Sequence, residues 1–345
     1  MTEDSQHLNI TDEGVMICSE LAKHAPSQSP LPERIPFHDH ILWRIGDWKV
    51  RRPLKEALLD VLIDHVKYTF GKEWAEAQYA LPEDERHVVV RWWFRVCEAQ
   101  KNAAPQGHRR GQLFAIPRTG DVTEFGYLAD DIYRLRLAEA LPRSLVDRLR
   151  SVDQYQGARY EVAVAASLVR SGFDIKWVDG HAKHCEFEAT HTVTNETIAV
   201  EAKSRHVSGT LNQSGKTPNR DDLRFVAHRY YNDALKQCPT DKPCAIFIDL
   251  NLPPESITDD DAIPWWEEMK RMFDALPKPT LDKPALESCL VLTNFSAHYS
   301  KSTLAPNHRY VFWFPRYVRH TLKKMSTFVG LIRAMETYGQ IPSVE

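Results

Sequence analysis

Three glutamates and one lysine near the middle of the chain have the types and spacing needed for metal-assisted hydrolysis. Glu201 and Lys203 stand two residues apart at the end of an apolar run, and Glu186 and Glu188 lie on the segment before it. Side chains two residues apart on a strand point to the same face. Carboxylates on such a face can hold a hard cation, and a lysine beside them can polarise or deprotonate an attacking water. The four residues therefore suit metal-dependent cleavage of phosphodiesters.

The pairing of these two segments decides whether the acids meet, because a slip of one residue sends a strand's side chains to the other face. A tight turn of two residues at 195–196 would place Glu188 opposite Lys203. Close carboxylates repel one another, and a divalent cation removes that cost. Mg²⁺ (or Mn²⁺) suits a few carboxylates because it keeps several waters. The predicted polar face gathers Glu186, Glu188, Glu201 and Lys203.

Glu161 is a further candidate for the same site. It is expected on a helix over Gly157–Arg170, at the edge of the apolar stripe. An inward carboxylate is unusual without a partner. We therefore expect Glu161 to reach the site from the helix side, as a ligand of a second metal ion or through water, unless it is an ordinary surface charge.

A basic segment follows the acids and offers contacts to phosphates. Positive charge beside the site would position a nucleic-acid backbone without reading its bases. The alternative is an ordinary solvated helix face. Three nearby histidines, at positions 181, 184 and 206, lack regular ligand spacing and are interpreted as loop residues. The predicted nucleic-acid contacts are Arg205, Lys216, Arg220, Arg224 and Arg229.

Composition narrows the class of protein. The chain has 345 residues and a net charge of -3, so any nucleic-acid contact must come from a local patch. Its six cysteines are widely spaced and contain no CxxC, which argues against structural zinc and predicts reduced thiols in a cytoplasmic protein. No secretory leader is evident, and no apolar run approaches the ~20 residues that span a bilayer.

Periodicity divides the chain into three parts. Residues 1–38 are polar and proline-rich, which predicts a flexible arm with one short helix near Val15–Leu21. Residues 39–150 show helical spacing and no comparable strand, so we expect a mainly helical domain. Residues 151–345 mix helical and strand patterns, which predicts an α/β domain with a mixed central sheet flanked by helices.

The expected elements follow from apolar periodicity and from turn residues. The predicted helices cover 53–70, 83–100, 127–141, 143–150, 157–170, 222–237, 265–276 and 321–338. The predicted strands cover 173–178, 185–193, 197–203, 245–250, 289–293 and 310–314.

This pattern resembles the PD-(D/E)XK nuclease superfamily, the restriction-endonuclease-like fold. The resemblance covers roughly Tyr155–Thr293 and is carried by Glu161, by Glu186 before Phe187, and by Glu201-Ala202-Lys203. It implies a nuclease that uses Mg²⁺ or Mn²⁺, usually on DNA, with these acids as ligands and the lysine as a catalytic residue. The first strand acid is normally aspartate in that superfamily, and glutamate here carries the ligand oxygen one methylene further out.

Three functions therefore stand side by side. The first is a DNA nuclease in restriction, phage defence or repair, whose helical part recognises a protein partner, a duplex or a signal, and which could act as a homodimer. The second is an inactive relative that binds nucleic acid or a partner protein, and it follows from the glutamate at position 186. The third is a helical adaptor whose α/β half is structural. Metal binding and salt-sensitive binding of nucleic acid distinguish them.

Overall fold

The computed structural model describes residues 7–10, 14–20, 33–54, 56, 58–104, 115–178, 184–219, 227–254, 265–306 and 308–339. Its helices are α1 (Leu58–Phe70), α2 (Lys72–Tyr79), α3 (Val88–Ala103), α4 (Gly120–Leu137), α5 (Arg143–Arg150), α6 (Tyr155–Arg170), α7 (Ala227–Leu235), α8 (Trp266–Ala275), α9 (Ala297–Ser300) and α10 (Met325–Glu336). Its strands are β1 (His7–Ile10), β2 (Gly14–Glu20), β3 (Glu33–Phe37), β4 (His40–Ile45), β5 (Trp48–Pro53), β6 (Phe173–Trp177), β7 (Phe187–His191), β8 (Thr197–Ser204), β9 (Cys244–Asp249), β10 (Cys289–Asn294) and β11 (Arg309–Pro315).

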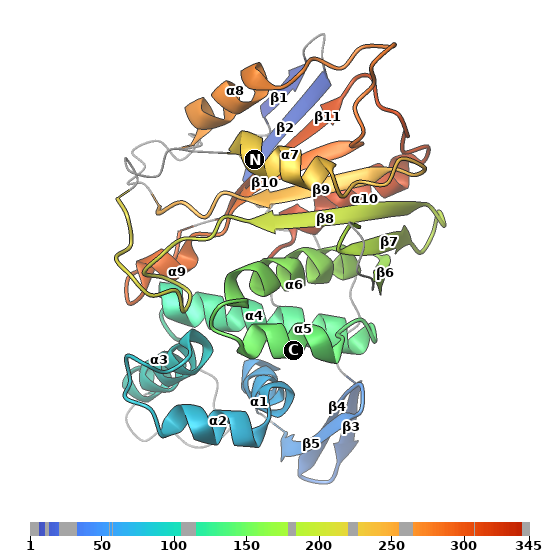
Figure 1. Ribbon diagram of the computed structural model, residues 1–345. Helices are drawn as coiled ribbons and strands as arrows, with labels where there is room; N and C mark the ends of the chain where they lie inside the picture. The colour runs from blue at the N-terminus through green and yellow to red at the C-terminus, as the bar shows by residue number, and fades with distance from the viewer. Residues whose placement is uncertain are drawn as a thin grey trace, which may run out of the picture.

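A mixed sheet forms the centre of the fold (Figure 1). Within the described residues its strand order is β1-β2-β11-β10-β9-β8-β7-β6. Strands β6, β7 and β8 form an antiparallel meander, β8, β9 and β10 run parallel, and β11 returns antiparallel. The prediction of an α/β fold with a mixed central sheet flanked by helices is confirmed. Helix α6 precedes the meander, and α7 connects β8 to its parallel neighbour β9.

Helices cover both faces of this sheet, because its central strands are apolar on both sides. Val200 and Ala202 of β8 pack into the core on the side of α6 and α10. Ala199, which alternates with them, packs into a second core beneath α7 and α8. Glu201 shares the face of Ala199 and therefore lies between the sheet and the α7 layer.

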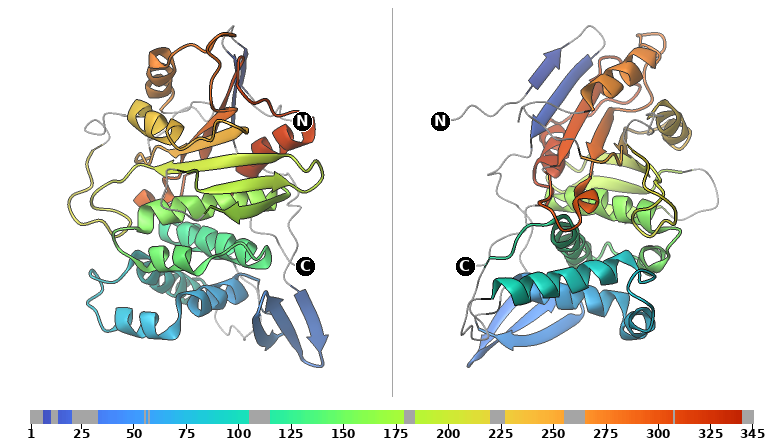
Figure 2. Two further views of the ribbon diagram at one scale, coloured as in Figure 1. Left: turned by 45° about the vertical axis from the view of Figure 1, so that its right-hand side comes forward. Right: turned by 90° about the vertical axis from the view of Figure 1, so that its left-hand side faces the viewer.

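A small antiparallel sheet, β3-β4-β5, lies at the opposite end of the molecule from β1 and β2 (Figures 1 and 2). The sequence analysis assigned no strand to 39–150 and missed β4 and β5. Ile41, Trp43 and Ile45 are buried in alternation, and a turn with Gly46 at φ 58° follows them. That alternation was readable as a strand signal. The core that contains Trp43 also contains Val200, so burial is continuous across residue 150.

The first 38 residues also differ from expectation. The short helix predicted near Val15–Leu21 is wrong, because Gly14–Glu20 forms β2, which pairs antiparallel with β11. Strand β1 then pairs with β2 at the outer edge of the sheet. The strands β1 and β2 stand beside β11 in Figure 2. A short apolar run cannot be assigned to helix or strand from its own periodicity, and here a long-range pairing decides.

The hairpin register also corrects the sequence prediction. Glu188 lies opposite Ala199, not opposite Lys203. The loop is longer than a two-residue turn, because His191 N–H donates to Glu196 O at 2.9 Å and Asn195 takes a left-handed φ of 57°. The shift is an even number of residues, so every side chain keeps its predicted face.

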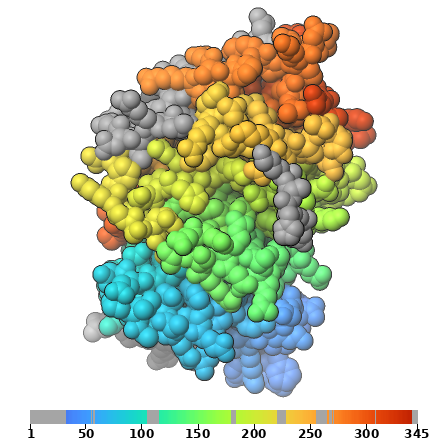
Figure 3. Space-filling view, in the orientation of Figure 1, coloured from blue at the N-terminus to red at the C-terminus, as the bar shows by residue number. Residues whose placement is uncertain are grey.

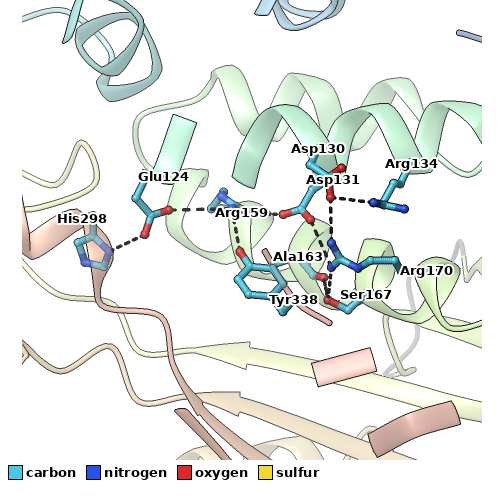
Figure 4. A network of polar contacts seen from close by, with 10 residues as sticks. All are labelled: Glu124, Asp130, Asp131, Arg134, Arg159, Ala163, Ser167, Arg170, His298 and Tyr338. Carbon is cyan, nitrogen blue, oxygen red and sulfur yellow. Dashed lines mark hydrogen bonds and ion pairs between the residues drawn. The ribbon is translucent and has the colours of Figure 1, made fainter. Parts of the chain in front are cut away.

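A buried network of charged residues fixes α6 against α4 and against Tyr338, just beyond α10 (Figure 4). Arg170 Nη1 donates to Asp130 Oδ2 at 2.9 Å, and Arg159 Nη1 donates to Asp131 Oδ2 at 2.8 Å. Arg159 Nη2 also donates to the hydroxyl of Tyr338 at 3.0 Å. Buried charges are tolerated only when they are paired in this way. The network therefore sets the position of the helix that carries Glu161.

The prediction of reduced cysteines is wrong for one pair. Cys238 and Cys244 form a disulfide between the end of α7 and the start of β9. Among the described side chains, Cys97, Cys185 and Cys289 are free. No helix in the described ranges is both long and apolar enough to cross a membrane.

Candidate functional site

Strand β8 brings the predicted Glu-x-Lys pair to one side of the sheet, and Lys203 forms an ion pair with Glu201. Glu201 is 0% exposed, whereas about a quarter of the Lys203 side chain is exposed. The alternative of a solvated surface pair therefore does not hold for Glu201. A carboxylate this deeply buried needs a reason, because burying an ionised group is costly.

Glu186 joins this pair from the neighbouring strand. It directly precedes β7, and its N–H donates to Val200 O at 3.0 Å. Its Oε1 lies 3.7 Å from Lys203 Nζ. The structure therefore gathers Glu186, Glu201 and Lys203, as the sequence predicted.

The electrostatics of Glu201 are unusual. Burial raises its pKa to about 7; the Lys203 ammonium opposes the rise, and the charges of Glu186 and Glu161 add to it. Its Oε1 pairs with Lys203 Nζ, and its Oε2 has no hydrogen-bond partner among the described residues. Glu201 therefore has acceptor capacity that a cation or a proton would fill.

Glu161 lies on α6 at the edge of this group, and it is buried. Its partner is Arg148 of α5, whose Nη1 and Nη2 donate to its two oxygens at 2.5 and 2.6 Å. Burial raises the pKa of Glu161, the Arg148 hydrogen bonds oppose the rise, and Glu186 adds to it. The sequence analysis missed Arg148, because its partner is on another helix and no local spacing reveals it.

Glu188 has an ion-pair partner of its own, Lys242. Its Oε1 accepts a hydrogen bond from Lys242 Nζ at 2.6 Å, just before β9 begins. The predicted metal-ligand role of Glu188 thus competes with an ion pair to Lys242.

The predicted nucleic-acid contacts differ in their exposure to solvent. Arg205 is half-buried beyond the end of β8, and burial lowers its pKa. Lys216 and Arg229 are exposed, and the Arg229 guanidinium lies 5.8 Å from the Tyr230 ring centre. Arg220 and Arg224 lie outside the described residues.

The three histidines noted near the site in the sequence also differ in their surroundings. His184 Nδ1 lies 2.8 Å from Cys185 O, and His181 is outside the described residues. His206 is exposed and faces Gly157 of α6. The loop that carries His206 is fixed to α6, because Gln156 Nε2 donates to Val207 O at 2.8 Å. Residues near 155 and residues near 207 adjoin on the face shown in Figure 3.

The donor set can be compared with the needs of Mg²⁺. Across the described ranges, no group of three or more His, Cys, Asp or Glu is arranged to hold a metal ion. Mg²⁺ often binds through only one or two carboxylates, with waters and substrate phosphates completing its shell. Glu201, with its free acceptor capacity, and nearby Glu186 fit that smaller set. Glu161 and Glu188 are held by Arg148 and Lys242.

In comparisons with known proteins, no protein-family model, no curated protein and no solved structure matches the chain. The site must therefore be interpreted from its own chemistry.

Proposed function

We propose that this chain is a metal-dependent nuclease that hydrolyses phosphodiester bonds of DNA. One observation carries the proposal. The Lys203 ammonium lies between two carboxylates from adjoining segments, the buried one of Glu201 and the partly exposed one of Glu186. The order of helix, three antiparallel strands, helix and parallel strand supports the proposed likeness to the PD-(D/E)XK fold. A setting in restriction, phage defence or repair rests on that likeness alone.

Each residue would have a distinct task. Glu186 and Glu201 would hold Mg²⁺ or Mn²⁺, and the ion would supply a polarised phosphate oxygen and a more acidic water. Lys203 would orient the attacking water and stabilise negative charge as it develops on the phosphate. Burial of Glu201 keeps its oxygens fixed and shielded from bulk water, so little reorganisation accompanies the reaction.

A second function competes on one specific observation. The ion pair of Arg148 with Glu161 leaves fewer free carboxylates than the sequence predicted. A chain of this kind could bind nucleic acid without cleaving it. Such a protein would not need Mg²⁺ at Glu186 and Glu201.

The test is a cleavage assay with purified full-length protein. Supercoiled DNA, linear DNA, single-stranded DNA and RNA are incubated with Mg²⁺, Mn²⁺ or EDTA, beside Lys203→Ala and Glu201→Gln. We expect cleavage of DNA that needs the metal and falls about 100-fold or more in both variants. Circular dichroism checks that the variants fold. Cleavage that persists in both variants would assign the activity elsewhere.

Absence of cleavage would be resolved by calorimetry. Mn²⁺ that binds the wild type but not Glu201→Gln would support an enzyme that lacks its substrate. DNA binding without metal binding would favour the non-cleaving function.

A further inference from the structure

Arg148 is placed to do more than neutralise Glu161. Its two terminal nitrogens hold the Glu161 carboxylate end-on, while 36% of its side chain is exposed. A guanidinium has five N–H donors, so this pairing leaves others free. In the described part of the chain, Arg148 has no second hydrogen-bond acceptor. Arg148 therefore contacts both the buried carboxylate of Glu161 and the solvent.

Gly157 keeps the space beside this pair open. A methyl group added there would lie 3.8 Å from Arg148 Nη2, 3.8 Å from His206 Nε2 and 3.9 Å from Glu161 Oε1. Three polar atoms from three segments thus surround a helix position that has no side chain. Glycine inside a helix costs up to about 1 kcal/mol of stability relative to alanine. Alanine would fit at position 157 without a clash, so packing alone does not require the glycine.

The charges around this space favour exchange of one anion for another. The negative charge of Glu186 acts on Arg148 as well as on Glu161. Arginine binds phosphate with the same two-pronged geometry that it uses for carboxylate. A phosphate that enters beside Gly157 could therefore take over the guanidinium from Glu161.

We propose that Arg148, with His206, forms a phosphate subsite, and that a backbone phosphate of DNA displaces Glu161 from Arg148. This inference rests on the proposed nuclease function. The exchange would free the Glu161 carboxylate toward Glu186 and Glu201 only when nucleic acid is bound. Bound DNA would thereby bring Glu161 together with Glu186 and Glu201, whereas in the free protein Glu161 stays on Arg148.

Binding measured without cleavage tests the exchange. A fluorescein-labelled 20-base-pair DNA duplex is titrated with full-length protein in EDTA over a range of KCl concentrations, and anisotropy gives the affinity. Arg148→Gln should weaken binding and reduce the slope of log K against log [KCl] by about 1, the loss of one phosphate contact. Glu161→Gln should bind more tightly than wild type, because Arg148 is no longer held by a carboxylate.

Three variants make the test specific. Arg143→Gln removes an exposed charge from the same helix, and its affinity should exceed that of Arg148→Gln. The double variant Arg148→Gln/Glu161→Gln, compared with Glu161→Gln, measures Arg148 without leaving a buried carboxylate unpaired. Gly157→Ala should melt at the same or a higher temperature than wild type yet bind the duplex more weakly.

The outcomes separate this inference from the function on which it rests. If wild type binds DNA but Arg148→Gln leaves the salt slope unchanged, the phosphate exchange alone is overturned. The same holds if Glu161→Gln binds the duplex more weakly than wild type. Failure of both wild type and Glu161→Gln to bind the duplex at 50 mM KCl overturns the exchange, while the nuclease proposal is decided separately by the cleavage assay, because EDTA removes the ion that the nuclease needs.

Discussion

The carboxylate of Glu186 lies 3.7 Å from the ammonium of Lys203, although the two residues come from neighbouring strands and do not face each other in the ladder. Lys203 reaches this position from the end of β8, while Glu186 stands just before β7. The lysine therefore bridges two strands, and Glu201, on its own strand, completes the group. The observed hairpin register differs from the predicted one by an even number of residues, so Glu186 and Lys203 still lie on the same face of the sheet.

Glu188 provides a test of which acids belong to the site. Because its carboxylate is bound to Lys242, Glu188→Gln should leave metal-dependent cleavage within about threefold of wild type, whereas Glu201→Gln should lose about 100-fold or more. Initial rates on supercoiled DNA at saturating Mn²⁺ measure both. A large loss in Glu188→Gln, with Lys242→Ala retaining activity, would return Glu188 to the set of metal ligands.

The buried network predicts a large cost for removing Arg170. This residue is fully buried and pairs with Asp130, which also pairs with Arg134, so Arg170→Met removes one of the two cations that compensate this buried acid. We expect a loss of about 3–5 kcal/mol in the free energy of unfolding, measured by urea titration. Lys236→Met breaks an exposed pair with Asp233 and should cost far less, because water screens an exposed ion pair. Equal costs for the two variants would contradict a structural role for the network.

His65 predicts a dependence of stability on pH. Burial lowers its pKa to about 3, with a further contribution from Arg136, and Asp47 opposes the shift. Among the described residues, neither ring nitrogen of His65 has a hydrogen-bond partner. Between pH 6.5 and about 3 the unfolded chain binds a proton that the folded chain does not, so stability falls as pH falls through this window.

The measurement compares wild type with His65→Leu at pH 8 and pH 5. Relative to wild type, the variant should gain about 2 kcal/mol in unfolding free energy on going from pH 8 to pH 5. Any change in packing contributes at both pH values and cancels. The exposed His228, changed to Gln, is the matched surface control for the loss of one imidazole. An equal pH dependence in wild type and His65→Leu would contradict a lowered pKa of His65 in the folded chain.

The Cys238–Cys244 disulfide closes a short loop, with a sequence separation of 6. Closing a loop of this length should stabilise the folded chain by about 2 kcal/mol, mainly by restricting the unfolded state. Urea unfolding with and without reductant, beside Cys238→Ala/Cys244→Ala, measures this. Mass spectrometry after alkylation in denaturant without reductant should show this pair protected; alkylation of both residues would instead confirm the reduced thiols expected from the sequence.

Local pattern was sufficient to locate most elements of the α/β half. Strand β8 differs from its predicted bounds only by one added residue, and α5, which comes just before that half, was predicted with its observed ends. The strand period of two also placed Glu201 and Lys203 on one face, because alternation is a property of the backbone itself. The sequence alone thus determined the central pair of the candidate site.

Tertiary structure decided how the elements meet. The hairpin register depends on the loop conformation at Asn195 and on its contact with α10, where Thr194 Oγ1 lies 2.7 Å from Thr327 Oγ1. The Arg148–Glu161 pair depends on how α5 packs against α6, and β2 depends on pairing with the distant β11. Such contacts join residues far apart in the chain, and the periodicity of one segment cannot specify its partner.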